Sequence, residues 1–343
     1  MKVWLEEDEE SAEAFRVELR GGELPGRRKQ AQALHESSLL GKAEVSSHKQ
    51  GSVRSAAAHG KQGSLLVVLG EEGGFVSAHA WADPALLVRS VEALFLRLQP
   101  AEVRLGTAGK WRPYPPEGAL FVRTIHSEQS DFQQIAVGEH PVYGRLLFLN
   151  GETQIGTSDE PEYSAALASA GLGKNTKRVC ILGGGDCGVL REVLGHEGVE
   201  EVVMIEIDRR VVETARSFFP GVVGGGPEDA RARIVYRDAN DFLTEEGARI
   251  ASGEAKGFDL IVYDLSDAPL AKASLDALCG RVKACLAPKG RIAVQCGSAL
   301  PMYTRQLKAH RAGLERHFRK LKLRELVIPS FLEQPWVFAS ARA

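Results

Sequence analysis

The feature that most constrains the fold is a regular alternation of strand and helix patterns that begins near Arg178. Short apolar runs alternate with segments of helical spacing: strands are predicted at 179–182, 202–205, 234–236, 260–263 and 292–295, and helices near 189–195, 209–219 and 273–286. Such alternation is typical of a mostly parallel sheet with helices on both faces. The sequence therefore predicts an α/β fold for its second half.

A glycine-rich turn follows the first of these strands. Gly183, Gly184 and Gly185 stand between the strand and the next predicted helix, and Asp186 follows them. Glycines let the backbone approach a ligand closely, and a helix N-terminus adds N–H donors and a positive dipole end. The turn predicts a bound nucleotide or nucleoside, although a tight turn alone can also require glycine.

Acidic residues stand where the next two strands end. Glu206 comes about 20 residues after the glycine turn, where a carboxylate can accept both ribose hydroxyls, and Asp238 follows the third strand. Glu206 or Asp208 could instead cap the helix that follows. Asp186 would repel a pyrophosphate. The layout therefore favours an S-adenosyl nucleoside over a dinucleotide, on a Rossmann-like sheet of the S-adenosylmethionine-methyltransferase type.

The charge of Asp186 also distinguishes two donors. Intact S-adenosylmethionine carries a carboxylate, whereas the decarboxylated molecule presents only a cationic propylamine with which Asp186 could pair. Asp186 is thus predicted to select the decarboxylated donor, although acidic residues also occur near this loop in methyltransferases.

Two further carboxylates, Asp264 and Asp267, follow the strand at 260–263. The carboxyl edge of a parallel sheet is where such folds bind ligands. An amine nucleophile is protonated near pH 7, so its attack on a sulfonium carbon requires a carboxylate that orients the ammonium and takes its proton. Asp264 is the candidate base. Asp267 is either a second contact for a cationic acceptor or a loop cap before Pro269.

Other acidic residues could contact a polycation. Asp159, Glu160, Glu162 and Tyr163 are predicted to lie in a loop, and Glu333 stands near the C-terminus. Carboxylates spaced along a binding surface would match the regularly spaced charges of a polyamine, although each one alone is more often a surface charge.

Composition argues against several other classes of protein. The formal net charge of −2 gives no basic excess that would point to nucleic acid. Five cysteines stand far apart without a CxxC pair, which argues against disulfides and a zinc site and favours a reducing compartment. No segment approaches the roughly 20 apolar residues of a membrane helix. We therefore expect a cytoplasmic protein without membrane or nucleic-acid partners, and no metal.

The first half of the chain predicts two smaller units. Its patterning predicts strands at 64–69 and 75–80, a helix over 87–98, and a β-meander with strands at 120–124, 133–137 and 145–149. The expected domains are an N-terminal α+β domain at 1–115, a β-meander domain at 116–158 and a Rossmann-like catalytic domain at 159–343.

Six motifs occur in order between about residues 118 and 340. They are Phe132-Gln133-Gln134-Ile135, Leu149-Asn150-Gly151-Glu152-Thr153-Gln154, Ser158-Asp159-Glu160 with Tyr163, Gly183-Gly184-Gly185-Asp186, Glu206-Ile207-Asp208 and Asp264-Leu265-Ser266-Asp267. Together they resemble the polyamine aminopropyltransferases, the family of the spermidine and spermine synthases.

The resemblance implies roles for individual residues. Asp186 and Asp264 would form the catalytic pair, Asp186 holding the propylamine end and Asp264 acting as the base. The donor-binding residues would be Gln133, Gly183, Gly184, Gly185, Asp186, Glu206, Asp238 and Ala239. The acceptor-binding residues would be Tyr163, Asp267 and Glu333. Decarboxylated S-adenosylmethionine would be a co-substrate, with no permanently bound cofactor.

The resemblance also bears on the acceptor. The ending 328–333 with 336–338 is similar to that of the spermine synthases, and the unit at 1–115 resembles their decarboxylase-like domain, which mediates dimerisation. These features predict a homodimer that converts spermidine into spermine and methylthioadenosine. Gln154 and Asp267 instead resemble the spermidine synthase pattern, and Cys187 replaces the usual glycine.

Four alternatives stay open at this point. Putrescine could be the acceptor, as in a spermidine synthase. Thermospermine could be the product, although enzymes of that kind usually have glutamate where Asp186 stands. A methyltransferase would use intact S-adenosylmethionine, and a catalytically idle homologue would only bind a nucleoside or polyamine.

Overall fold

The computed structural model describes residues 122–140, 142–265, 275–299, 303–331 and 334–343, together with Arg89 and the strands between Trp4 and Pro113. The chain divides into two compact units. The first comprises Met1–Thr124, Gly138–Gly144 and Gly151–Thr153, and the second comprises Ile125–Val137, Arg145–Asn150 and Gln154–Ala343.

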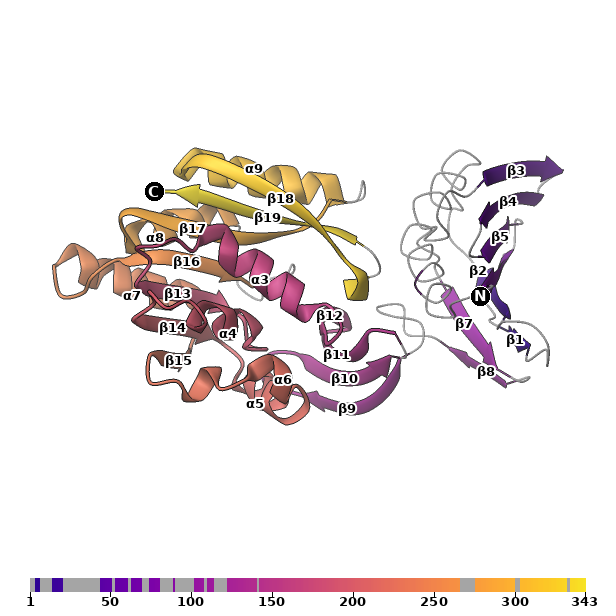
Figure 1. The fold of residues 1–343 in the computed structure, drawn as a ribbon, viewed down its shortest axis with the longest axis horizontal. Coiled ribbons are helices and arrows are strands. Elements are labelled where there is room, and N and C mark those ends of the chain that lie inside the picture. The colour runs from indigo at the N-terminus through magenta and orange to yellow at the C-terminus, as the bar shows by residue number, and fades with distance from the viewer. Residues whose placement is uncertain are drawn as a thin grey trace. The chain divides into compact units, whose positions relative to one another are not determined.

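The first unit contains an antiparallel sheet in the order β3-β4-β5-β6-β2-β7-β8, with β1 paired to β2 (Figure 1). Its strands are β1 (Trp4–Glu6), β2 (Ala14–Arg20), β3 (Glu44–Gln50), β4 (Val53–Gly60), β5 (Gly63–Leu69), β6 (Gly74–Ala80), β7 (Glu102–Thr107) and β8 (Lys110–Pro113). The strands predicted at 64–69 and 75–80 correspond to β5 and β6. The helix predicted over 87–98 lies outside the described residues, apart from the helical Arg89.

The meander is a four-stranded sheet in the order β12-β11-β10-β9. Its strands are β9 (Arg123–Gln129), β10 (Gln134–His140), β11 (Gly144–Leu149) and β12 (Glu152–Gly156). The prediction missed β12, although its turn signal is present in the sequence. Asn150 and Gly151 both have positive φ, at 50° and 84°, which is the conformation that an Asn-Gly hairpin turn requires.

The second unit contains a seven-stranded sheet in the order β15-β14-β13-β16-β17-β19-β18. Its strands are β13 (Arg178–Gly183), β14 (Glu201–Glu206), β15 (Ala232–Tyr236), β16 (Phe258–Asp264), β17 (Leu286–Ser298), β18 (Arg319–Ile328) and β19 (Gln334–Arg342). Neighbours from β15 to β17 are parallel, whereas β19 and β18 add an antiparallel edge. The predicted α/β fold with a Rossmann-like sheet is confirmed.

Helices cover both faces of this sheet (Figure 1). They are α3 (Glu160–Gly171), α4 (Gly188–Leu194), α5 (Arg209–Phe218), α6 (Pro220–Val223), α7 (Ala239–Ala251), α8 (Leu275–Cys285) and α9 (Thr304–His317). Helices α3 and α4 pack on one face, and α7, α8 and α9 contribute to the core on the other. The expectation of a loop at 159–163 is wrong, because α3 begins at Glu160 with Pro161 in its first turn, a position that suits proline.

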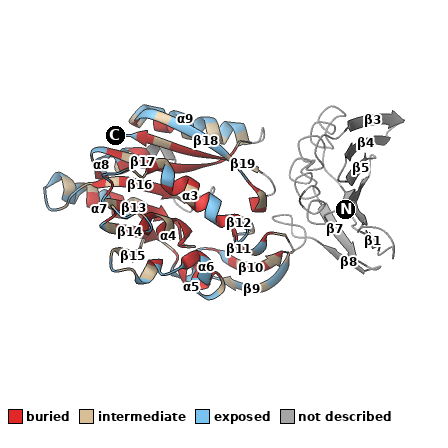
Figure 2. Ribbon diagram, in the orientation of Figure 1, coloured by how far each residue is buried: buried red, intermediate tan, exposed pale blue. Residues whose placement is uncertain are grey.

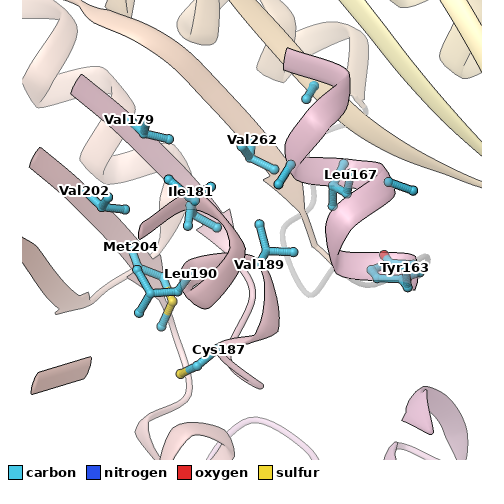
Figure 3. Close-up of a cluster of buried hydrophobic side chains, with 14 of the residues drawn as sticks. Tyr163, Leu167, Val179, Ile181, Cys187, Val189, Leu190, Val202, Met204 and Val262 are labelled. Carbon is cyan, nitrogen blue, oxygen red and sulfur yellow. The ribbon is translucent and has the colours of Figure 1, made fainter. Parts of the chain in front are cut away.

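The central strands are apolar on both sides, as parallel strands between two helix layers must be. Val179 and Ile181 of β13 pack toward α3 and α4, and Cys180 and Leu182 pack toward the opposite helices. Figure 2 shows these strands as buried, and Figure 3 shows Val179 and Ile181 beside the side chains of β14 and α4. Burial of each aliphatic side chain stabilises the folded state by about 1.5–3 kcal/mol. The packed core therefore holds the central strands, and with them the strand ends, in fixed positions.

Among the described residues, no helix is both long enough and apolar enough to cross a lipid bilayer.

Candidate active site

The glycine turn predicted after the first strand forms at the carboxyl end of β13. Gly183 and Gly184 have φ values of +80° and +73°, a region that side chains rarely adopt. A Cβ on Gly183 would lie 2.2 Å from the main-chain oxygen of Asp264, and the N–H of Gly184 donates to that oxygen at 3.1 Å. Glycine is therefore required for the turn to lie directly against the end of β16.

Asp264 ends β16 beside this turn, in register with Gly183. Its Oδ1 accepts a hydrogen bond from the Tyr163 hydroxyl at 3.0 Å, and its Oδ2 would lie 3.3 Å from a Cβ on Gly184. Burial, together with the charges of the nearby Asp186 and Glu206, raises the pKa of Asp264 to about 8, although the hydrogen bond from Tyr163 acts to lower it. A carboxyl group with this pKa can take up a proton near neutral pH.

Asp186 lies at the end of the glycine turn, just before α4. Its Oδ1 accepts a hydrogen bond from the N–H of Gly188 at 2.8 Å. Burial and, to a smaller extent, the charge of Glu160 raise the pKa of Asp186 to about 6, against the lowering effects of the Gly188 hydrogen bond and of Arg191. Cys187 follows in a left-handed conformation, with φ of 68°, and its side chain is buried in the core beside α4 (Figure 3).

Glu206 and Asp208 stand together at the end of β14, and Asp208 is the one of the two that caps the next helix. Asp208 caps α5, since its side chain accepts from the N–H of Arg210. Glu206 is buried, and its Oε1 accepts from the N–H of Asp208 at 2.9 Å. Burial raises the pKa of Glu206 to about 7. Gln133 belongs to the same cluster, because its Nε2 donates to Asp208 at 3.1 Å.

Asp238 and Ala239 follow β15, the next strand of the sheet. Asp238 caps α7, and its Oδ1 accepts from the N–H of Asn240 at 2.6 Å. Ala239 is the buried first residue of that helix. The residues predicted to bind a donor therefore follow the carboxyl ends of three adjacent strands, β13, β14 and β15, with Asp264 at the end of the fourth, β16.

The acidic residues at the start of α3 differ from the surface charges considered above. Asp159 is buried and accepts from both the N–H and the hydroxyl of Ser330, at 2.6 and 2.7 Å. Glu160 is buried and accepts two hydrogen bonds from the Arg191 guanidinium, at 3.0 and 3.1 Å. Glu162 is exposed. The carboxylates of Asp159 and Glu160 are thus hydrogen-bonded to other groups of the protein, unlike charges on an open surface.

Tyr163 lies one turn into α3, with its ring edge-on to Phe331 and Phe338 at centroid distances of 5.7 and 5.3 Å. Only its hydroxyl reaches the polar groups at the strand ends. Asp267 and Glu333, the other two residues predicted to contact an acceptor, lie outside the described residues.

The sequence reasoning did not identify the residues that support this site. They are Ser130, whose hydroxyl donates to Asp208 at 2.6 Å, Arg191, and Ser330. Their partners are 78, 31 and 171 positions away in the chain, so no local spacing marks them. Across the described part of the chain, no group of His, Cys, Asp and Glu side chains is arranged to hold a metal ion.

The arrangement presents several carboxylates at the edge where a Rossmann-like sheet binds ligands. A glycine turn and a helix N-terminus can hold a nucleoside, and the carboxylates favour positive charge on the ligand. Fold and site therefore define an α/β enzyme of the nucleoside-cosubstrate class that suits a cationic substrate.

Comparison with known proteins identifies the family. The model of the spermine/spermidine synthase domain matches residues 160–343. The polyamine aminopropyltransferase of Halorhodospira halophila is 32% identical over 62% of this chain and 75% of its own length. The spermine synthase of Saccharomyces cerevisiae is 39% identical, over 44% of this chain and 51% of its own length. The chain belongs to the spermine/spermidine synthase family of polyamine aminopropyltransferases.

Solved structures agree with this assignment. The crystal structure of spermidine synthase from Thermotoga maritima superposes with a TM-score of 0.55 and 27% sequence identity, covering 64% of this chain and 72% of that chain. A spermidine synthase in complex with the transition-state analogue AdoDATO superposes with a TM-score of 0.56 over the same shares of the two chains.

Proposed function

We propose that this chain transfers the aminopropyl group of decarboxylated S-adenosylmethionine to spermidine, giving spermine and methylthioadenosine. The observation that supports the proposal most is the position of Asp264. Its carboxyl group has a pKa raised to about 8, accepts a hydrogen bond from Tyr163, and lies beside the glycine turn that precedes Asp186. A base for an amine nucleophile and a carboxylate for a cationic donor thus stand at one sheet edge.

In this proposal the glycine turn and the strand ends bind the donor. Gly183, Gly184 and Gly185 leave room for the nucleoside to approach the backbone. Glu206 accepts the ribose hydroxyls. Asp186 pairs with the propylamine ammonium. Gln133 holds the Glu206 loop through Asp208, and Asp238 and Ala239 border the donor from the end of β15.

The reaction is a nucleophilic displacement at the propylamine carbon attached to sulfur. Asp264 accepts a proton from the acceptor ammonium, which frees the nitrogen lone pair. The nitrogen–carbon bond forms as the carbon–sulfur bond breaks, and the electron pair of that bond goes to sulfur. The positive sulfonium thereby becomes the neutral thioether of methylthioadenosine. Tyr163 orients the Asp264 carboxylate through its hydroxyl.

Spermidine is proposed as the acceptor because the C-terminal sequence 328–333 with 336–338 is similar to that of spermine synthases, and one matched relative bears that name. Putrescine is the second candidate. Gln154 and Asp267 follow the spermidine synthase pattern, and both superposed structures are spermidine synthases. Thermospermine formation ranks below both. The domain limits at 115/116 and 158/159, a homodimer formed through the N-terminal unit and a cytoplasmic location also remain predictions.

The test is a product assay with the purified chain. Decarboxylated S-adenosylmethionine is incubated separately with putrescine, spermidine and spermine, and the amines are separated by chromatography. Spermine formed only from spermidine would support the proposal, while product from putrescine would make the chain a spermidine synthase. Absence of product with every amine would contradict the proposed function and favour a methyltransferase or an idle homologue.

A further inference from the structure

Two buried carboxylates at the start of α3 fix the helix turn that carries Tyr163. Asp159 accepts from the N–H and hydroxyl of Ser330, just before β19. Glu160 accepts from Arg191 of α4 and also from the hydroxyl of Ser164. The two adjacent residues therefore tie α3 to two different parts of the fold.

The Arg191–Glu160 contact has the geometry of a two-pronged ion pair. Nη1 of Arg191 lies 3.0 Å from Oε2 of Glu160, and Nη2 lies 3.1 Å from Oε1. The exposed fraction of the Glu160 side chain is 1% and that of Arg191 is 24%. Nη1 also donates to the main-chain oxygen of Val222 at 2.7 Å. Only a planar guanidinium can make these contacts together.

The space around this pair is tightly filled. A Cβ on Gly188 would lie 2.2 Å from Oε1 of Glu160, 2.6 Å from the hydroxyl of Ser164 and 3.0 Å from Oδ1 of Asp186. The Glu160 carboxylate therefore occupies one defined position against the first turn of α4. If the Glu160 carboxylate moved, the first turn of α3 would have to move with it, and the close contact with Gly188 leaves little room for that.

Tyr163 is three residues after Glu160, on the same side of the helix. Its hydroxyl reaches Asp264 at 3.0 Å, while its ring is held by Phe331 and Phe338. We propose that the Arg191–Glu160 pair positions Tyr163 so that its hydroxyl stays hydrogen-bonded to the Asp264 carboxylate. In this proposal Arg191 contacts neither substrate. The inference rests on the proposed function, because Asp264 is taken as the base.

The pH dependence of the reaction reports this positioning. The hydrogen bond from Tyr163 lowers the pKa of Asp264, and its loss raises that pKa. The carboxylates of Asp186, Glu206 and Glu160 also act on Asp264, and each raises its pKa. A saturating donor engages Asp186 and Glu206, so kcat/KM for the acceptor at saturating donor isolates the titration of Asp264.

The main variant is Arg191→Lys, which keeps the positive charge and removes the planar guanidinium that makes two hydrogen bonds to Glu160. We expect kcat to fall roughly 3- to 10-fold, as for a small displacement of a catalytic group. The acid limb of kcat/KM should move to higher pH, in the same direction as in Tyr163→Phe. In the double variant that combines Arg191→Lys with Tyr163→Phe, the acid limb of kcat/KM should lie at the same pH as in Tyr163→Phe alone. The reason is that the two changes act through one hydrogen bond.

A matched control is Arg231→Lys. Arg231 also pairs with a carboxylate, at 2.8 Å from Asp229, and donates to the main-chain oxygens of Leu194 and Val199. These partners do not belong to α3. This variant should lower the thermal unfolding midpoint without moving the acid limb.

Glu160→Gln is the second variant. If Glu160 acted on Asp264 only by its charge, its removal would move the limb to lower pH, whereas loss of positioning moves it to higher pH. Any one of three results would overturn the inference while leaving the proposed function intact. They are a shift of the acid limb to lower pH in Glu160→Gln, an unchanged acid limb in Arg191→Lys, and a full additional shift in the double variant. A wild-type chain without turnover would overturn both.

Discussion

Buried or half-buried carboxylates occur in two regions of the second unit, and the two regions differ in their partners. At the start of α3, Asp159 and Glu160 accept hydrogen bonds from Ser330 and from Arg191. At the strand ends, Asp186, Glu206 and Asp264 accept from main-chain N–H groups or from Tyr163. No lysine or arginine of the described chain forms a salt bridge with these three.

We interpret the difference as one between acidic residues that stabilise the fold and acidic residues proposed to bind substrates. Burial without a cationic partner raises the pKa values of Asp186, Glu206 and Asp264 to about 6, 7 and 8. In this arrangement the ionised form of the three carboxyl groups is disfavoured unless a cation binds beside them. The first region therefore holds the fold in place, and the second is suited to a cationic ligand.

The largest effect is expected at Asp264. Asp264→Asn removes the base and retains the shape of the side chain, so kcat should fall by on the order of 10²-fold or more. The affinity for decarboxylated S-adenosylmethionine, measured by calorimetry, should stay within roughly threefold of wild type. Unchanged turnover would show that Asp264 is not the base.

The next effect is that of pH. Asp264 must be ionised to accept a proton, and its pKa is raised to about 8. Below its midpoint, kcat/KM for the acceptor should therefore rise about tenfold per pH unit for a single group, and level off above. The bound donor cation moves the midpoint below 8. Stopped assays from pH 5.5 to 9.5 measure this, and the residual rate of Asp264→Asn should lack this limb.

A smaller effect is expected at Asp186, and it is confined to one end of the donor. Asp186→Asn removes the charge that pairs with the propylamine, which should weaken binding of decarboxylated S-adenosylmethionine by about 10-fold or more. Methylthioadenosine lacks the propylamine, so its affinity should change little. Equal losses for both ligands would mean that the substitution disturbs the glycine turn as a whole.

The smallest functional effect is expected at Asp159, in the structural region. Asp159→Asn weakens two hydrogen bonds to Ser330 and should lower the free energy of unfolding by about 1–3 kcal/mol. Donor affinity should remain that of wild type. Chemical denaturation and calorimetry test this pair of results. A loss of donor affinity with unchanged stability would place Asp159 in the binding site and erase the contrast between the regions.

The sequence predicted the second region better than the first. Parallel strands end at one edge, so acidic residues after β13, β14 and β16 could be grouped from strand positions alone. The cap at Asp208 was one of two stated possibilities. The pairing of Glu160 with Arg191, and of Asp159 with Ser330, joins residues 31 and 171 positions apart. Such contacts depend on how helices pack, which local patterns do not encode.

The contact between Tyr163 and Asp264 spans 101 positions, and only the family resemblance suggested that Tyr163 helps position substrates. The start of α3 was a different case. The sequence was predicted to form a loop there, although the proline signal of a helix start was present in Asp159-Glu160-Pro161. Asp267 and Glu333 lie outside the described residues, so their acceptor contacts stay predictions.

The most direct test of the central claim compares two donors on one protein. Calorimetric titration of the wild-type chain near pH 8, where Asp186 and Glu206 are largely ionised, measures the affinity for decarboxylated and for intact S-adenosylmethionine. The account predicts that the decarboxylated molecule binds at least about 10-fold more tightly, because its ammonium meets the Asp186 carboxylate without a carboxylate of its own. Equal or tighter binding of the intact molecule would contradict it.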